Sequence, residues 1–389
     1  MTSPARISRL LFTSAILLLA ARASAQNATP APPAPATGPY KIINSDKVGG
    51  AGSFDYVYAD SDGRRLYIPR ANRVDVYDLD SLAPLGNISN TPRVHGAAVD
   101  PKSGHGFCSS NPVVMWDTKT LATIKTIPVE GSPDGILFEP ATERVYILSH
   151  SSPNVTAIDA TSGNIVGTVD LGGAPEQAAS DGKGHVYIDL EDKDAIAVVD
   201  ANALKLTGTY DISSQGGGPG GLAMDTKNGI LFAACHDPQN MVVVNAADGK
   251  ILAALPIGSS TDGATFNQNT LEAFSSQGDG TLTIIKENSP TDFAVEQNLK
   301  TKTGAKTLTL DSKTGNIYLI TADRAPRPTA APPATPASNT TVATTPPSNT
   351  TVATATPPPS PPPGGGRRGG RGGAMVPNSF TILVVGKGA

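Results

Sequence analysis

Residues 134–171 have the sequence DGILFEPATERVYILSHSSPNVTAIDATSGNIVGTVDL, in which four short apolar runs alternate with turn residues. The runs at 134–138, 144–148, 154–159 and 165–171 are rich in β-branched and aromatic residues, and Gly, Pro, Asp and Asn occur in the breaks. Runs of this length and composition are typical of β-strands joined by turns. No helical periodicity interrupts them, so the stretch predicts one four-stranded antiparallel sheet.

The second expected strand of this unit contains Tyr146, and an aromatic residue recurs at the equivalent place along the whole chain. The gaps between successive aromatics are 40, 39, 41, 45, 42 and 44 residues, and an acidic residue or Asn lies six or seven positions before each. A period near 40 with four strands per unit predicts an all-β fold, a seven-bladed β-propeller. One blade cannot bury both faces of its sheet, so we expect the aromatics to pack between adjacent blades. The seven aromatics are Tyr67, Phe107, Tyr146, Tyr187, Phe232, Phe274 and Tyr318.

The last repeat is divided in the sequence. Its first two strands are expected at 306–310 and 317–321 and its third at 380–385, but no fourth strand follows before the chain ends. Residues 40–48, which precede two glycines, resemble the fourth strand of the other repeats. We therefore predict a propeller over residues 40–389, in which the N-terminal strand closes the last blade and leaves no unpaired junction.

Three segments differ in composition from the propeller. Residues 1–25 have a basic start, an apolar run too short to cross a bilayer, and the small-residue site Ala23-Ser24-Ala25. This is the pattern of a secretory signal peptide, so we expect an exported protein, periplasmic or extracellular. Residues 26–39 and 324–378 are rich in Pro, Ala, Thr or Gly and cannot bury enough apolar surface to fold. They are expected to be a disordered linker and a disordered insertion within the last blade.

Charge and cysteine content restrict the possible partners. The chain carries 30 Lys and Arg against 34 Asp and Glu, a net charge of −4, and residues 324–378 contain five Arg and no acid. The propeller itself is therefore acidic, which argues against nucleic acid as its partner. The two cysteines, Cys108 and Cys235, fall on blades far apart in the ring, so we expect buried free thiols and no disulfide.

At this point the repeats resemble a known family. Residues 155–163 (VTAIDATSG) followed by 165–169 (IVGTV) resemble the YVTN-type propeller repeat, and the mature chain is similar to exported bacterial proteins of the YncE family. YILS at 146–149 and YLIT at 318–321 stand in place of the name-giving tetrapeptide. The resemblance implies an exported, WD40-like propeller. One branch of the family binds single-stranded DNA, and seven-bladed lactonases and haem-associated reductases have similar folds.

Polar residues recur where the first strand of a blade starts and where the second strand ends, which are positions on the same face. The first-strand starts, aligned by repeat, are Asp55, His95, Asp134, Glu176, Gly220, Asp262 and Lys306. We expect the mouth of the central channel to be ringed by the candidate ligand-binding residues His95, Asp134, His150, Glu176, Glu191, His236 and Asp262. Imidazoles and carboxylates together hold divalent metals or transfer protons. The best metal candidates are His150, Glu191 and His236, equivalent positions of three consecutive blades.

Two alternatives for function follow. The first is a monomeric, non-catalytic propeller that binds a small molecule or an envelope protein or polymer at its channel mouth. The second is a lactonase-like hydrolase or metal-assisted lyase that uses His95, His150, Glu191 and His236. The sequence contains no Cys-x-x-Cys-His, Gly-x-Ser-x-Gly or His-Glu-x-x-His motif, which excludes covalent haem and gives no support to serine esterase or zincin chemistry. No cofactor is expected, with a divalent metal at the candidate residues as the one alternative.

Overall fold

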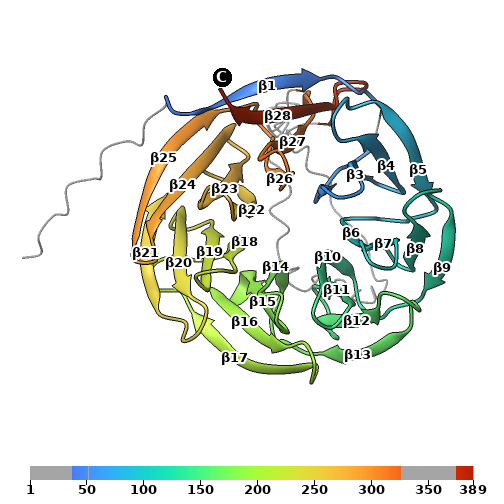
Figure 1. Cartoon of the computed structure of the whole chain (residues 1–389), viewed down its shortest axis with the longest axis horizontal. Helices are drawn as coiled ribbons and strands as arrows, with labels where there is room; N and C mark the ends of the chain where they lie inside the picture. Colours follow the sequence, from blue (N-terminus) through green and yellow to red (C-terminus); the bar gives the residue numbers. More distant parts are fainter. Residues whose placement is uncertain (1–36, 51, 326–373, 389) are drawn as a thin grey trace, which may run out of the picture. The chain divides into compact units, whose positions relative to one another are not determined.

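Seven four-stranded antiparallel sheets form a ring in the computed structural model, which describes residues 37–50, 52–325 and 374–388 (Figure 1). These residues contain strands and one 3-10 turn, η1 (Glu191–Lys193), and no helix among them is long and apolar enough to cross a membrane. The all-β, seven-bladed prediction is confirmed. The predicted signal peptide, residues 26–36 of the linker and residues 326–373 of the insertion lie outside the described residues.

Each blade has its first strand at the channel and its fourth at the rim (Figure 1). The first strands are β2 (Tyr58–Asp60), β6 (Ala97–Asp100), β10 (Pro133–Glu139), β14 (Pro175–Ser180), β18 (Pro219–Asp225), β22 (Thr261–Asn267) and β26 (Thr307–Leu310). The second strands are β3 (Arg65–Arg70), β7 (His105–Cys108), β11 (Arg144–Ser149), β15 (His185–Leu190), β19 (Ile230–Cys235), β23 (Glu272–Gln277) and β27 (Ile317–Thr321). The third strands are β4 (Arg73–Asp78), β8 (Val113–Asp117), β12 (Val155–Asp159), β16 (Ala195–Asp200), β20 (Asn240–Asn245), β24 (Thr281–Ser289) and β28 (Thr381–Lys387). The outer strands are β5 (Pro84–Ser89), β9 (Thr123–Ile127), β13 (Ile165–Val169), β17 (Lys205–Asp211), β21 (Ile251–Pro256), β25 (Asp292–Lys300) and β1 (Tyr40–Asp46).

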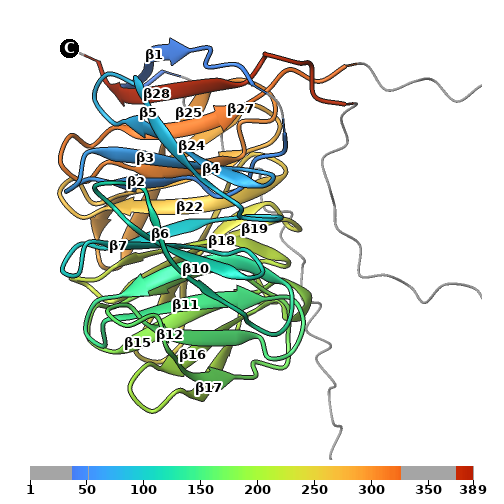
Figure 2. The same ribbon diagram turned by 90° about the vertical axis from the view of Figure 1, so that its right-hand side faces the viewer.

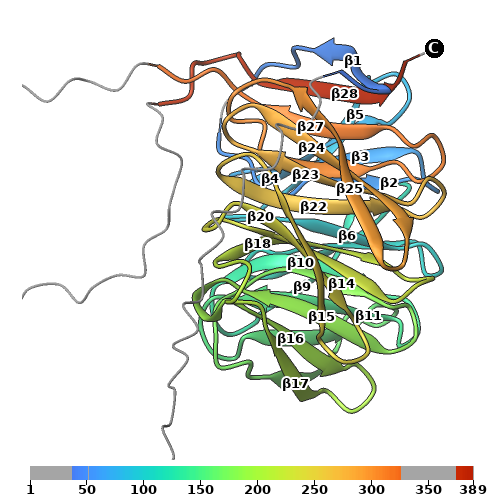
Figure 3. The same ribbon diagram turned by 90° about the vertical axis from the view of Figure 1, so that its left-hand side faces the viewer.

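The N-terminal strand closes the ring as predicted. β1 pairs antiparallel with β28, and Figures 2 and 3 show the two strands side by side. Tyr40 is buried, its ring meets Phe274 edge to face at 5.2 Å, and its hydroxyl donates to Glu272 in blade 6. Gln297 bonds both the backbone N–H and the carbonyl of Tyr40, at 3.0 and 2.9 Å. The closing strand is thus fixed to two blades at once.

The recurrent aromatics pack between blades, as expected. All seven are buried; Tyr67, for example, lies in one apolar cluster with Val99 and Trp116 of the next blade, its ring centroid 5.6 Å from that of Trp116. The two cysteines are also buried and free, which confirms the expectation of no disulfide. The aromatic period therefore records blade packing and carries no ligand chemistry.

The polar residue before each aromatic closes the turn between the first two strands. In blade 1, Asp60 Oδ1 accepts the backbone N–H of Gly63 at 2.8 Å, and in blade 5 Asp225 Oδ1 accepts that of Lys227 at 2.9 Å. Such side-chain to backbone bonds define tight turns. The seven equivalent acceptors are Asp60, Asp100, Glu139, Asp181, Asp225, Asn267 and Asp311. These turns lie on the face opposite the channel mouth.

A β-bulge at the start of the first strand recurs in blades 3 to 6. A bulge breaks the alternation of the strand and redirects the extra side chain. The bulges contain Asp134, Glu176, Gly220 and Asp262, so four first-strand starts are turned out of the regular sheet pattern. Gly135 is required in the first of them, because a Cβ there would lie 2.4 Å from the carbonyl oxygen of Glu176.

Candidate functional site at the channel mouth

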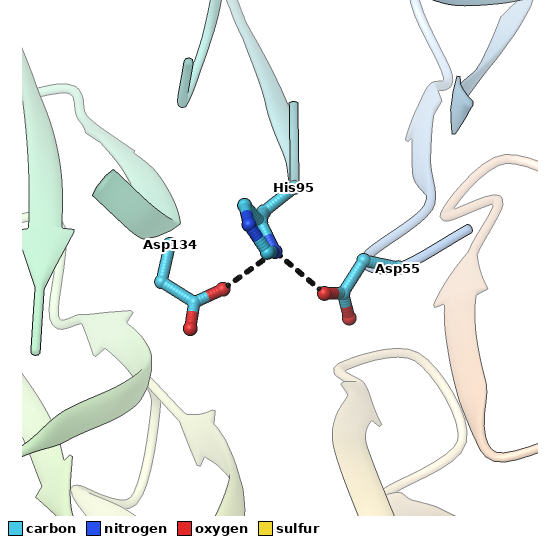
Figure 4. A group of neighbouring side chains, drawn as sticks. All are labelled: Asp55, His95 and Asp134. Atoms are coloured by element: carbon cyan, nitrogen blue, oxygen red, sulfur yellow. Dashed lines mark hydrogen bonds and ion pairs between the residues drawn. The ribbon is translucent and has the colours of Figure 1, made fainter. Parts of the chain in front are cut away.

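The channel mouth is the end of the central channel at which the first strands start. His95 lies two residues before β6, and its backbone N–H donates to the carbonyl of Ser109 at 3.1 Å. Its Nδ1 lies 2.8 Å from Asp55 Oδ2 and 3.1 Å from Asp134 Oδ1 (Figure 4). One imidazole therefore joins carboxylates from the two neighbouring blades.

A second imidazole repeats this arrangement one blade further on. His150 follows β11, and its Nε2 lies 3.3 Å from Asp134 Oδ2 and 3.1 Å from Glu176 Oε2. The carboxylate of Asp134 thus gives one oxygen to each histidine. Four consecutive blades are connected through side chains that touch in sequence: Asp55, His95, Asp134, His150 and Glu176.

Tyr56 connects the two ends of this series across the channel. It follows Asp55 in blade 1, and its hydroxyl donates to Glu176 Oε1 in blade 4 at 2.7 Å. Both oxygens of Glu176 therefore have a partner, one an imidazole and one a phenol. These contacts form a closed polar circuit over half of the channel mouth. Its members are Asp55, Tyr56, His95, Asp134, His150 and Glu176.

The remaining blades present a different arrangement at equivalent positions. Blade 5 has Gly220, and the ammonium of Lys306 in blade 7 forms an ion pair with Asp262 in blade 6. Gln177 also bridges blades: its Oε1 accepts the backbone N–H groups of Leu222 and Ala264, each at 3.0 Å. This half of the mouth is neutralised and tied together without any histidine in these contacts.

Two predicted residues, Glu191 and His236, lie on the adjoining blades beside Gly218. A Cβ on Gly218 would lie 3.5 Å from His236 and 3.9 Å from Glu191. The structure brings His150 together with Asp134 and Glu176, and the charge of Glu191 also acts to raise the pKa of His150. The roles of Glu191 and His236 remain a prediction.

Hydrogen bonding to carboxylates controls the charge of both histidines. Burial alone would lower the pKa of His95, but its bonds to Asp134 and Asp55 outweigh burial and raise this pKa to about 10. The hydrogen bond that His150 donates to Glu176 raises the pKa of His150 to about 8, with burial acting in the opposite direction. In the absence of a bound cation, both rings are mainly imidazolium at pH 7. Their protons hold the surrounding acids together.

Beneath the mouth the channel contains a cavity of about 370 Å³. All seven first strands contribute to its wall, and the Tyr56–Glu176 bridge lies at its polar end. Apolar side chains such as Ile136, Leu222 and Phe266 line it together with polar groups, so its surface is about as polar as it is apolar. A small ligand would therefore meet charged groups first and a mixed surface behind them.

Two overlapping sets of side chains have the composition of metal sites. One is Asp55, His95 and Asp134, and the other is Asp134, His150 and Glu176. In each set the donor atoms lie within 4.8 Å of one another. These are the sets of three or more His, Cys, Asp or Glu that meet this distance among the described residues.

Sequence reasoning omitted two residues of this site. Asp55 is a first-strand start, like His95 and Asp134, but it is not among the predicted binding residues. Tyr56 is not among the predicted residues, because the repeat register does not encode a contact that crosses the channel; the equivalent position is glycine in four repeats and polar in two, as Gln177 and Thr307.

Comparison with known proteins supports the architecture alone. No family model matches the sequence, and no curated protein matches it. A solved structure described as "Crystal structure of RRP9 WD40 repeats" aligns with a TM-score of 0.61 at 11% identity, over 74% of this chain and 91% of that one. One described as "Structure of U3-55K" aligns with a TM-score of 0.61 at 10% identity, over 72% and 90%.

The chain is therefore a seven-bladed β-propeller with the architecture of the WD40 proteins. At these identities the likeness shows the fold and assigns no function.

Proposed function

We propose that this protein is an exported propeller of the YncE type that binds a small ligand or an envelope partner at its channel mouth. Export, to the periplasm or beyond the cell, rests on the sequence pattern of residues 1–25. The family assignment rests on the resemblance of the repeats.

The observation that carries the binding role is the closed polar circuit above the cavity. Surface carboxylates and imidazoles are ordinarily solvated separately, yet here residues from four blades converge, and all but His150 are half-buried or buried. Asp134 retains 12% of its side-chain exposure and Glu176 17%. Converging polar groups over a cavity are the usual features of a ligand pocket.

A double variant tests this role. Asp134→Asn with Glu176→Gln alters the mouth, while Asp181→Asn with His185→Gln alters a matched His–Asp contact, 2.8 Å long, on the opposite face. Thermal shift and calorimetry with defined polyamines, short peptides and oligosaccharides should identify a probe that binds the wild type and the control but not the mouth variant. If every probe that binds does so equally to all three proteins, the mouth is not the binding site.

The second candidate, a lactonase-like hydrolase or metal-assisted lyase, is favoured by one observation. Each imidazole of the circuit has two carboxylates as neighbours, as in many acid–base and metal sites. Hydrolysis of simple lactones by the purified chain, with and without added Zn²⁺, distinguishes the two. Turnover that is lost in His150→Gln would establish the enzyme; binding without turnover would leave the binding role.

Nucleic acid is disfavoured as the partner by the acidic propeller. The resemblance to a family with a DNA-binding branch makes the question worth one direct measurement. A gel shift with single-stranded DNA that persists after deletion of residues 324–378 would require the propeller itself to bind DNA.

A further inference from the structure

We infer that the channel mouth is a paired site for two divalent transition-metal ions that share Asp134. The first ion would be held by Asp55, His95 and Asp134, and the second by Asp134, His150 and Glu176. This inference rests on the proposed function, because it specifies what the same site binds.

The spacing of the donor atoms is the first argument. Ligand atoms about 2.1 Å from one ion, at tetrahedral or octahedral angles, lie roughly 3.0–3.4 Å from each other. In the first set the separations from His95 Nδ1 are 2.8 and 3.1 Å, and in the second those from His150 Nε2 are 3.1 and 3.3 Å. The donors already stand close to coordination distance, so small shifts would accept an ion.

The division of Asp134 is the second argument. Its Oδ1 faces His95 and its Oδ2 faces His150. A carboxylate with one oxygen directed to each of two donor sets is placed to bridge two ions, and two-metal sites hold their ions about 3.5–4 Å apart. Asp134 lies in a β-bulge, which fixes its side chain in this position on rigid backbone.

The chemistry of the donors selects the class of metal. One imidazole nitrogen and two carboxylate oxygens per ion suit Zn²⁺, Mn²⁺ or Fe²⁺, whereas Ca²⁺ and Mg²⁺ prefer oxygen alone. Three protein ligands leave coordination positions for water or for a bound ligand. Tyr56 supplies outer support, since its hydroxyl holds the Glu176 oxygen that does not face His150.

The opposite face provides a natural control. His185 Nδ1 lies 2.8 Å from Asp181 Oδ2, as close as any His–carboxylate contact at the mouth, but no third donor among the described residues completes a set. A lone His–Asp contact is common in proteins without metal. The distinction between this pair and the mouth therefore depends on the third donor, which can be tested directly.

The experiment uses the full chain, stripped with chelator and titrated with Co²⁺ by visible absorption and with Zn²⁺ by calorimetry, in excess Mg²⁺. Two Co²⁺ or Zn²⁺ should bind per wild-type chain. His95→Gln should retain one ion, His150→Gln should retain the other, and Asp134→Asn should lose both or bind them at least 100-fold more weakly. His185→Gln should still bind two.

Circular dichroism and thermal unfolding verify that each variant is folded. A wild-type chain that binds fewer than two ions overturns the inference, as does an Asp134→Asn variant that still binds two.

The polyamine, peptide and oligosaccharide probes are then repeated on the chelator-stripped chain. Fewer than two bound ions, together with mouth-dependent probe binding to the stripped chain, refutes the paired site and leaves the proposed function intact, whereas two bound ions with no mouth-dependent probe refute the proposed function alone.

Discussion

The two halves of the channel mouth use the same repeat positions in opposite ways. In blades 1 to 4, imidazoles connect acids into a circuit that extends from Asp55 to Glu176. In blades 5 to 7, Gly220 lies against the ring of His236, and Lys306 neutralises Asp262 directly. Bulged first strands occur in both halves, in blades 3 and 4 and in blades 5 and 6, so the difference lies mainly in side-chain identity.

This contrast separates architecture from chemistry. A permanently charged ammonium satisfies a carboxylate without leaving room for a metal ion, whereas an imidazole is itself a ligand once its proton is lost. The first half can therefore exchange protons for a cation, and the second half stays an internal ion pair. Substitutions that remove contacts from either half should show which contacts stabilise the propeller and which contribute to ligand binding.

The largest effect on stability is expected at the closing strand β1, which completes blade 7 and contacts blade 6. Tyr40→Ala removes a buried ring from its contact with Phe274 and should lower the free energy of unfolding by about 3–5 kcal/mol. Tyr40→Phe keeps the ring and loses the bond to Glu272, so it should cost about 1 kcal/mol. Urea unfolding measures both. Equal losses in the two variants would mean that the hydroxyl, and not ring packing, secures the closure.

Closure was predictable because it depends on alternation and repeat count, which the sequence displays. The aromatic positions, the turn-closing acids and the N-terminal fourth strand all follow from local pattern. The grouping at the site did not follow in full. His150 could be located by its register, but its partners depend on the direction taken by the chain after β11 and on bulges in β10 and β14, which no repeat position encodes. Tyr56 was missed because its partner is on a blade across the channel.

The second largest effect is expected at Lys306. Lys306→Met leaves Asp262, which retains 18% side-chain exposure, without its ammonium, and should destabilise the fold by about 2–3 kcal/mol. Lys302→Met is the matched control on the approach to the same blade, because the Lys302–Asp323 pair is about half exposed. Its removal should cost less than about 1 kcal/mol. Similar losses in urea unfolding would show that Lys306 is also only a surface charge.

A buried pair of acids between blades 5 and 6 shows what happens when no histidine is present. Glu287 is 1% exposed, accepts a bond from Asn228 at 2.7 Å, and lies near Asp225. Burial, reinforced by Asp225, raises the pKa of Glu287 from its usual 4.5 to about 7. The folded state therefore holds an extra proton between these values, and its stability falls as the pH rises through this window.

Glu287→Gln should remove that dependence. We expect the variant to match the wild type near pH 4 and to exceed its stability by about 1–2 kcal/mol at pH 8, because the amide never has to ionise in the interior. Glu130→Gln, on an exposed loop, should follow the wild type at every pH. Urea denaturation at a series of pH values measures the free energy of unfolding of all three proteins. A wild-type curve that is flat from pH 4.5 to 7 would show that Glu287 ionises as freely as an exposed acid.

The smallest effect on stability is expected at Tyr56, which belongs to the polar circuit of blades 1 to 4. Tyr56→Phe loses one hydrogen bond, worth about 1 kcal/mol or less, and Tyr210→Phe should lose a similar amount through its 2.8 Å bond to the Ala246 carbonyl. Of the two substitutions, only Tyr56→Phe removes a hydrogen bond to Glu176. This variant should bind Zn²⁺ about 10-fold or more weakly, because a proposed metal ligand loses its support. Unchanged affinity in Tyr56→Phe would make Tyr56 a strut across the channel and confine the cation chemistry to the five residues of blades 1 to 4.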